Sequence, residues 1–262
     1  MIKTAAVRAL DVVGLGAPAR QVASRVPHVA SRLRDLGVLP WKPLVPEAAF
    51  TGCLRHALRE LRRHEPAEAM GDYLEFGVSR GTSMACVHRV LQERALSRVR
   101  LIGFDSFEGM PTEAAGQGWR PGEFRSTLDA TRRYLAAREV DLERVALVKG
   151  WFKDTLTPET RNRLHIGKAS LILIDCDIYT ASREALAFSE PHIRDRAVVV
   201  FDDWGLETRM RNIGQKEAFE EFLAGNPDIH AEALPAYAPQ ARVFMLSRRP
   251  PAGSGWPVAE GR

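Results

Sequence analysis

Short apolar runs alternate with amphipathic helical stretches along this chain, and this alternation constrains its fold more than any other feature. Runs rich in valine, isoleucine and leucine are separated by segments whose apolar residues recur at helical spacing. Runs that are apolar on both faces are typical of parallel strands covered by helices on both sides. The last two runs have no helix between them, which predicts that they pair antiparallel at one edge of the sheet. The predicted strands are DYLEFGV, VRLIGFD, RVALVKG, SLILID, RAVVVFDD, DIHAEAL and ARVFMLSR.

These strands predict an α/β fold with a mostly parallel seven-stranded sheet, an antiparallel edge strand and helices on both faces. The predicted helices are residues 46–64, GTSMACVHRVLQERAL, STLDATRRYLAARE, TASREALAFSEPHI and NIGQKEAFEEFLAG. A segment rich in proline and glycine, EGMPTEAAGQGWRPGEF, follows the second strand. We expect it to form a lid or a wall of a binding site, because long loops above strand ends commonly do so.

The composition indicates one domain with additions, because 262 residues with 45% hydrophobic content can bury a large core. No apolar run approaches the roughly 18 residues that a membrane span needs, so we expect a soluble chain without one. The three cysteines, Cys53, Cys86 and Cys176, have no C-x-x-C spacing. This pattern argues against a disulfide framework or a zinc site and favours a reducing, cytoplasmic environment.

The net charge of +4 is concentrated at the front of the chain. Residues 1–45 hold seven basic and two acidic residues, so the rest of the chain is close to neutral. Since the body carries no basic stripe, we expect no nucleic-acid partner. We expect residues 1–45 to form a basic helical extension that covers the body or a partner subunit of a homo-oligomer. A flexible or membrane-surface arm is the alternative. Residues 248–262, rich in proline and glycine, predict a flexible tail.

A glycine turn follows the first predicted strand, in the stretch YLEFGVSRGTS. Gly77 and Gly81 allow the backbone to turn tightly and let a ligand approach. Thr82 and Ser83 can cap the following helix, whose amides then point back at the ligand. The spacing is G-x-x-x-G rather than G-x-G-x-x-G, so the dinucleotide fingerprint is not met. The turn therefore predicts the floor of a ligand pocket at the carboxyl ends of the strands.

The next two strand ends indicate what kind of ligand this is. Asp105 ends the second strand, 28 positions after Gly77, where an acid can accept both hydroxyl protons of a ribose. Trp151 and Phe152 follow the third strand and can flank an adenine ring, although a role as core or rim aromatics is equally compatible with the sequence. The combination predicts an adenosine-containing ligand that lacks a pyrophosphate.

Five stretches together resemble a known family. YLEFGVSRGTS, FDSFEGMP, VKGWFKDTL, IDCDIYTASREAL and VVVFDDW, which span residues 73–204, are similar in order and separation to the macrocin O-methyltransferase family of sugar methyltransferases. The resemblance implies a class I methyltransferase (Rossmann-like) fold over residues 46–247, S-adenosylmethionine bound over the glycine turn, a divalent metal, and deoxysugar hydroxyls of natural products as acceptors. It also implies that Glu75 helps to hold the amino acid end of the cofactor. The candidate cofactor residues are Glu75, Gly77, Gly81, Thr82, Ser83, Asp105, Ser106, Trp151, Phe152 and Asp175.

Four aspartates follow the fourth and fifth strands, which are neighbours in the strand order that the resemblance implies. Ends of adjacent strands lie about 4.8 Å apart, so Asp175, Asp177, Asp202 and Asp203 are expected to converge. Four carboxylates in so small a volume repel one another, and an oxygen-seeking Mg²⁺ would relieve that repulsion. By similarity Asp175, Asp202 and Asp203 are the metal ligands and Asp177 is the catalytic base, with the division of roles between Asp175 and Asp177 left open. An isolated acidic pair after a strand is also compatible with a helix cap or a solvated turn.

Two residues depart from the family pattern and concern the acceptor. Cys176 stands where glycine is common, and Trp204 stands where tyrosine is more frequent, so we expect the acceptor pocket to differ. A phenol or catechol acceptor is the nearest alternative to a sugar. A non-catalytic module that binds S-adenosylmethionine is a second alternative, and a nicotinamide oxidoreductase is disfavoured by the missing second glycine.

Overall fold

A seven-stranded sheet forms the centre of the protein in the computed structural model, which describes residues 43–117, 119–204 and 214–248. The strand order is β3-β2-β1-β4-β5-β7-β6, and all pairs from β3 to β5 are parallel. The strands are β1 (Asp72–Phe76), β2 (Leu101–Asp105), β3 (Val145–Lys149), β4 (Ala169–Ile174), β5 (Arg196–Phe201), β6 (Ile229–Leu234) and β7 (Arg242–Arg248). The predicted antiparallel pairing of the last two strands is confirmed. β7 lies between β5 and β6 and is antiparallel to both. The edge strand on this side of the sheet is therefore β6.

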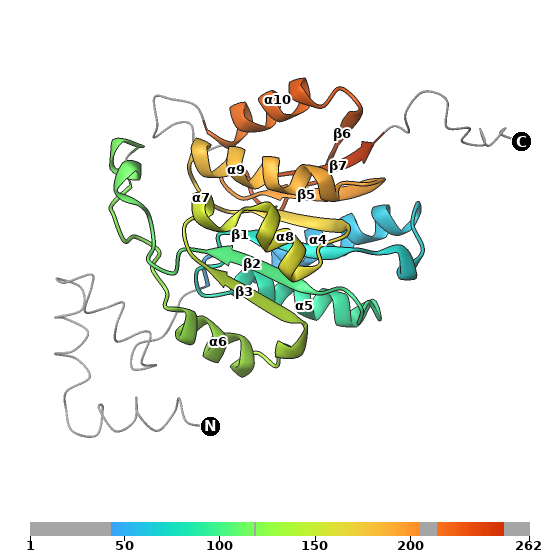
Figure 1. The fold of residues 1–262 in the computed structure, drawn as a ribbon. Coiled ribbons are helices and arrows are strands. Elements are labelled where there is room, and N and C mark those ends of the chain that lie inside the picture. Colours follow the sequence, from blue (N-terminus) through green and yellow to red (C-terminus); the bar gives the residue numbers. More distant parts are fainter. Residues whose placement is uncertain (1–42, 118, 205–213, 249–262) are drawn as a thin grey trace, which may run out of the picture.

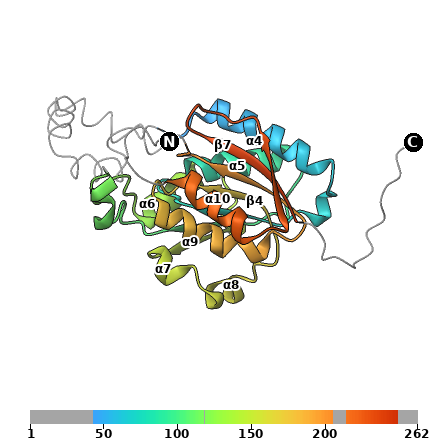
Figure 2. The ribbon, with the colours of Figure 1, turned by 90° about the horizontal axis from the view of Figure 1, so that it is seen from above.

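Helices cover both faces of the sheet, as predicted (Figure 1; Figure 2). α4, α5 and α6 contribute side chains to the core on one face, and α7, α8, α9 and α10 to the core on the other. The helices are α4 (Glu47–Arg62), α5 (Thr82–Glu93), α6 (Leu128–Ala137), α7 (Phe152–Thr155), α8 (Pro158–Leu164), α9 (Tyr179–Ser189) and α10 (Gln215–Gly225). The sequence did not predict α7 and α8, because helices of four and seven residues are too short to show a period.

The parallel strands are apolar throughout because alternate residues enter two different cores. Along β4, Leu171 and Leu173 point into the core with α4 and α5, whereas Ile172 and Ile174 point into the core with α9 and α10. All six residues of β4 are buried. Continuous apolar strands in the sequence therefore follow directly from the cover on both faces.

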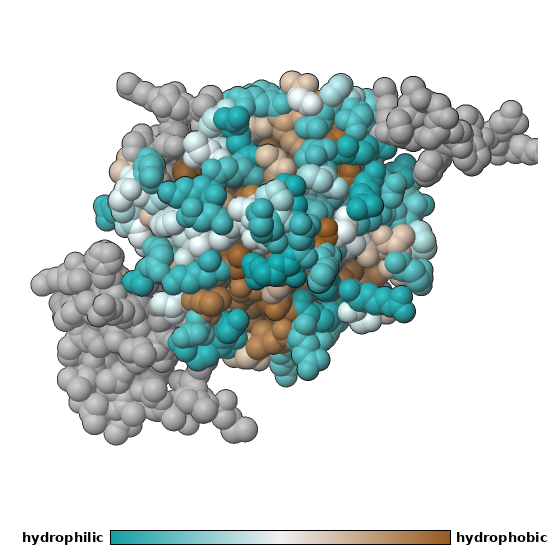
Figure 3. Space-filling model, viewed as in Figure 1, coloured by the Kyte–Doolittle hydropathy of each residue, from teal (hydrophilic) through white to brown (hydrophobic). Residues whose placement is uncertain are grey.

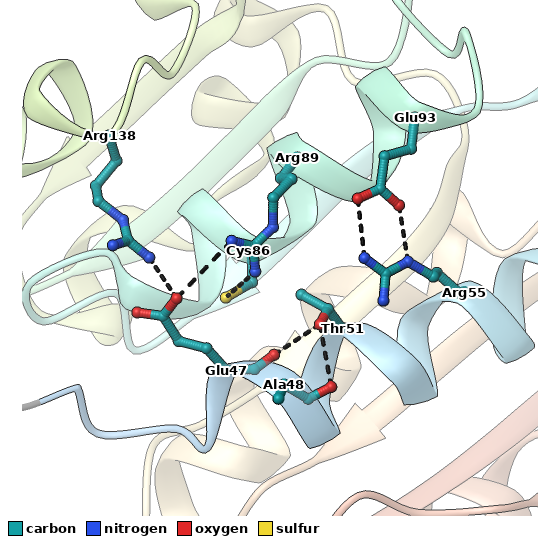
Figure 4. Close-up of polar contacts among 8 residues, drawn as sticks. All are labelled: Glu47, Ala48, Thr51, Arg55, Cys86, Arg89, Glu93 and Arg138. Atoms are coloured by element: carbon teal, nitrogen blue, oxygen red, sulfur yellow. Dashed lines mark hydrogen bonds and ion pairs between the residues drawn. The ribbon is translucent and has the colours of Figure 1, made fainter.

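The first described helix is held mainly by its apolar face. Its predicted core residues are all buried, at Phe50, Leu54, Leu58 and Leu61. Figure 4 shows the polar contacts of the same helix: Arg55 donates two hydrogen bonds of 2.7 and 2.9 Å to Glu93 of α5, and Glu47 pairs with Arg138 after α6. Exposed ion pairs add little stability, so we attribute the docking of α4 chiefly to burial.

The described surface includes one face on which hydrophobic side chains are visible. Figure 3 shows them near β3, which is the sheet edge opposite β6, and residues 145–147 of this strand are only half-buried. Among the described residues, no helix is both long and apolar enough to cross a membrane. The predicted N-terminal extension and C-terminal tail fall almost wholly on residues 1–42 and 249–262, which lie outside the described residues.

Candidate active site

A cavity of about 650 Å³ opens at the carboxyl ends of the parallel strands. It lies at the point where the chain order reverses, since β2 and β3 lie on one side of β1 and β4 and β5 on the other. This is the position at which open α/β sheets bind their ligands. The predicted site residues that line the cavity are Gly77, Asp105, Ser106, Trp151, Phe152, Asp175, Asp177, Asp202 and Asp203. Those that do not line it are Glu75, Gly81, Thr82 and Ser83.

Gly77 is required by the neighbouring strand end rather than by a helix. Its φ of +94° lies in the left-handed region, and a Cβ at this position would lie 1.6 Å from the backbone carbonyl oxygen of Asp175. The Gly77 N–H donates to the carbonyl oxygen of Phe104 at 3.0 Å, and the Asp175 N–H donates to that of Phe76 at 2.9 Å. The first glycine therefore allows the tips of β1, β2 and β4 to meet under the cavity.

Glu75 lies behind the glycine turn and is fully buried. The Tyr73 hydroxyl donates to its carboxylate at 2.8 Å, and the Ser83 hydroxyl donates to the other oxygen. Burial raises the pKa of Glu75 to about 8, although both hydroxyl donors act in the opposite direction. This acid, which is unusual in an apolar strand, thus fixes β1 to the first turn of α5.

The predicted helix caps are wrong. α5 begins at Thr82, with Gly81 at the N-cap position in a left-handed conformation (φ +86°), and no side chain caps this end. Ser83 instead points its hydroxyl at Glu75. The left-handed backbone conformation at the N-cap position favours glycine. Thr82 and Ser83 therefore lie inside the helix and not at its cap.

Asp105 joins the loops that follow β1 and β2. One carboxylate oxygen accepts the Ser79 N–H at 2.8 Å and the other accepts the Phe107 N–H at 2.5 Å. Burial raises the pKa of Asp105, while these backbone donors lower it. A carboxylate has about four acceptor positions, and the backbone of Val78 also lies within hydrogen-bonding reach, so the acceptor capacity that remains can serve hydroxyl groups of a ligand in the cavity.

The insertion after β2 supplies a wall of the cavity, as its length predicted. The insertion is linked to the glycine turn by Ser79, whose hydroxyl donates to the Phe124 carbonyl oxygen at 2.8 Å. The rings of Phe124 and Trp119 meet edge to face with centroids 5.4 Å apart, and both line the cavity together with Met110. Ser79 and Phe124 adopt positive φ values of 44° and 60°, which are uncommon outside glycine and frequent at functional sites.

The two aromatics after β3 lie at different depths. Trp151 is 37% exposed at the rim, whereas Phe152 begins α7 and packs edge to face on Phe76 with centroids 5.9 Å apart. Both line the cavity. Phe152 therefore packs in the core and also faces the cavity. A position in the core is thus compatible with a contact to an adenine ring.

Three of the four carboxylates that were predicted to converge after β4 and β5 do so. One oxygen from each of Asp175, Asp202 and Asp203 lies within 4.8 Å of the others. The last ladder pair of these adjacent strands is Ile174 with Phe201, so the acids project from two tips in register. None of them forms an ion pair with a lysine, arginine or histidine of the described residues.

The proximity of these acids alters their protonation equilibria. Burial, followed by the charges of Asp202 and Asp203, raises the pKa of Asp175 well above its usual range. The pKa of Asp203 is likewise raised by burial and then by neighbouring acids, and burial raises that of Asp202 to about 6. Oxygen-only donors at this spacing fit a hard divalent cation, whose charge would remove the repulsion.

Asp177 lies beside this group of three and not within it. Its φ of 60° turns the chain, and its N–H donates to Asp203 Oδ2 at 3.2 Å. Burial and the charge of Asp202 raise the pKa of Asp177 to about 7. In an ideal strand the side chains of Asp175 and Asp177 would point in the same direction. The turn at Asp177 separates them, so only Asp175 joins the group of three acids.

Gln215, the first residue of α10, is a residue beside the acids that the sequence did not predict. Its side chain is almost fully buried beneath the acids and hydrogen-bonds to Asp203. It was assigned only to a helix, and a single polar residue at a helix start carries no signal of such a contact.

The expected effect of Trp204 on the acceptor pocket is wrong, whereas that of Cys176 stays a prediction. The Trp204 ring packs on Phe201 and Phe244, with centroids 5.2 and 5.3 Å apart, and does not line the cavity. Trp204 lies in this apolar cluster because its ring can extend the core there. Cys176 lines the cavity, and its sulfur lies 3.5 Å from the Ser182 hydroxyl.

The fold is that of the class I methyltransferases. The chain superposes on the solved O-methyltransferase NovP with a TM-score of 0.61 and 22% identity, covering 78% of this chain and 79% of NovP. It superposes on the O-methyltransferase TomG from Streptomyces achromogenes, solved in complex with SAM, with a TM-score of 0.54 and 18% identity, covering 89% and 96%. These structures share the sheet and its helical cover with the chain.

The chain belongs to the macrocin-O-methyltransferase (TylF) family, whose sequence profile matches residues 19–224. A curated relative is the 8-demethyl-8-(2,3-dimethoxy-alpha-L-rhamnosyl)-tetracenomycin-C 4'-O-methyltransferase of Streptomyces olivaceus, with 30% identity over 146 residues. The match covers 52% of this chain and 54% of that relative, so the chain spans about half the length of this relative.

Proposed function

We propose that the protein is an S-adenosylmethionine-dependent, Mg²⁺-dependent O-methyltransferase that acts on a sugar hydroxyl of a bacterial natural product. The observation that carries this proposal is the meeting of Asp175, Asp202 and Asp203 within 4.8 Å at one edge of a ligand-sized cavity. Membership in the macrocin-O-methyltransferase family supports the reaction type. The free thiols of all three cysteines support a cytoplasmic location.

The cofactor would occupy the part of the cavity above Gly77. Asp105 keeps acceptor positions for the ribose hydroxyls, Ser106 lies beside it, and the two aromatics after β3 flank the adenine. Glu75 acts from behind the turn, where it fixes the backbone under the amino acid end through Ser83 and Tyr73. Ser83 acts through its hydrogen bond to Glu75, and Gly81 supplies the left-handed conformation of the turn.

The acceptor hydroxyl would lie between the acids and the methyl group. Asp175, Asp202 and Asp203 would hold Mg²⁺, which lowers the pKa of a coordinated hydroxyl when it is bound. Asp177 lines the cavity next to these ligands and would accept the hydroxyl proton. The wall formed by Met110, Trp119 and Phe124 would shield the reacting atoms from water and offer aromatic faces to a sugar or its aglycone.

A transfer assay tests the proposal. The protein is incubated with labelled S-adenosylmethionine and Mg²⁺, and with either rhamnosyl glycosides or catechols of similar size. We expect methylation of the glycosides, its loss in EDTA, and its return when Mg²⁺ is added. Undiminished turnover in EDTA refutes the metal role, and methylation of catechols alone refutes the sugar acceptor. Binding of S-adenosylmethionine without transfer to any acceptor favours a non-catalytic binding module.

A further inference from the structure

A buried glutamine amide connects the tips of β4 and β5 beneath the acidic group. The Gln215 side chain is 1% exposed. Its Oε1 accepts the backbone N–H of Asp203 at 3.1 Å, and its Nε2 donates to the carbonyl oxygen of Ile174 at 3.2 Å and to Asp203 Oδ2 at 3.4 Å. All three contacts are made to residues at the strand tips, across 12 and 41 positions of the sequence.

The start of α10 does not account for this amide. The Gly214 N–H, which precedes the helix, is accepted by the Glu217 carboxylate at 2.6 Å. A buried amide is costly unless its polar atoms find partners, and the partners of Gln215 among the described residues lie at the two strand tips. The hydrogen bonds of the Gln215 side chain therefore hold the two strand tips and not the start of α10.

The contacts also orient one particular carboxylate. Asp203 Oδ2 accepts two N–H groups, one from Gln215 and one from the Asp177 backbone at 3.2 Å. Asp203 also lines the cavity, and its side chain interacts with that of Asp177. The two N–H groups on Oδ2 therefore fix the orientation in which this carboxylate meets the cavity. Since Ile174 directly precedes Asp175, the same amide fixes the spacing between the two tips that carry the acids.

We propose that Gln215 is a positioning residue that orients Asp203 and sets the spacing between the β4 and β5 tips for a divalent cation. This inference rests on the proposed function, because it assumes the metal role of Asp175, Asp202 and Asp203. Groups that hydrogen-bond to metal ligands commonly contribute about 10- to 100-fold to metal affinity.

The test measures metal and cofactor binding separately on the full chain. Gln215→Met keeps the length of the side chain and removes its hydrogen bonds, and Gln215→Asn keeps the amide but withdraws it by one methylene. Gln92→Met, at an exposed glutamine on α5, is the matched control. Mn²⁺ affinity is measured by electron paramagnetic resonance, S-adenosylhomocysteine affinity by calorimetry, and folding by circular dichroism and thermal melting.

We expect both Gln215 variants to bind Mn²⁺ about 10-fold or more weakly, while their affinity for S-adenosylhomocysteine stays within about twofold of the native value. The control should bind both as the native protein does. Unchanged Mn²⁺ affinity in a folded variant, an equal loss of both affinities, or failure of both variants to fold would overturn the positioning role. Absence of Mn²⁺ binding in the native protein would instead refute the metal site of the proposed function and this inference with it.

Discussion

The backbone carbonyl oxygen of Asp175 occupies the space that a side chain on Gly77 would need, since a Cβ there would lie 1.6 Å from it. This contact brings the glycine turn and the acidic group of the site to the same point in the fold. Because backbone atoms of a central strand cannot move aside cheaply, the contact leads to a prediction about stability as well as about binding.

Gly77→Ala should destabilise the protein by about 3 kcal/mol or more, since it adds a backbone clash to a strained positive φ. Chemical denaturation with urea measures the change. Gly52→Ala is the matched control, because Gly52 lies within α4 and a Cβ there meets nothing within 4 Å. The control should be neutral or more stable by about 0.5–1 kcal/mol. Equal stability of the two variants would contradict the close approach.

Glu75→Gln should stabilise the protein more at pH 9 than at pH 5. The folded-state pKa of Glu75, about 8, lies above the ordinary value of 4.5. Between these values the folded protein retains a proton that the unfolded chain has released, so the free energy of unfolding falls as the pH rises. A pKa difference of one between the folded and unfolded states corresponds to roughly 1.4 kcal/mol, so the contrast between pH 5 and pH 9 should amount to a few kcal/mol.

The measurement for Glu75 is a pair of urea denaturation curves at each pH for the variant and the native protein. Comparing the differences at pH 5 and pH 9 cancels the effect of the substitution itself. Glu232→Gln, at an exposed residue of β6, is the control and should show no such trend. A stability difference of Glu75→Gln that does not depend on pH would show that this carboxyl ionises normally in the folded protein.

The sheet and the acidic group could be predicted because both follow from strand order. Once β4 and β5 are adjacent and parallel, Asp175 and Asp202 must follow the same ladder pair, Ile174 with Phe201. Short-range patterns also located α4 and the wall after β2. Periodicity predicts the strands and helices, whereas the adjacency of β4 and β5 was predicted from the strand order that the family resemblance implies.

The features that were missed depend on long-range contacts of single side chains. Thr82 and Ser83 look like helix caps, but Glu75 and the left-handed Gly81 determine how that turn is built. Gln215 meets Asp203 only after the chain has passed through residues 205–213. No local pattern distinguishes a buried glutamine from an exposed one at a helix start, so packing decides its role.

Asp105→Asn should weaken S-adenosylmethionine binding by about tenfold or more, which corresponds to about 1.4 kcal/mol. The asparagine oxygen can accept only one of the two N–H groups that now meet the carboxylate, so the NH₂ group faces a donor. Calorimetric titration measures the affinity. Asp195→Asn is the control, because Asp195 is an exposed aspartate that pairs with Lys168 and does not line the cavity. Equal affinities of the two variants would exclude Asp105 from the binding site.

Asp177→Asn and Asp175→Asn should separate the base from a metal ligand. If Asp177 accepts the hydroxyl proton, its amide variant should lose about 10²- to 10⁴-fold in kcat and keep its Mn²⁺ affinity, because Asp177 is not among the three acids within 4.8 Å. Asp175→Asn should lose Mn²⁺ affinity directly, and high Mg²⁺ should restore part of its activity. Single-turnover rates across a Mg²⁺ series, together with Mn²⁺ titrations, measure both effects. If Asp177→Asn is rescued by Mg²⁺ and Asp175→Asn is not, the two roles must be exchanged, and the left-handed turn between them would then direct Asp177 rather than Asp175 toward the ion.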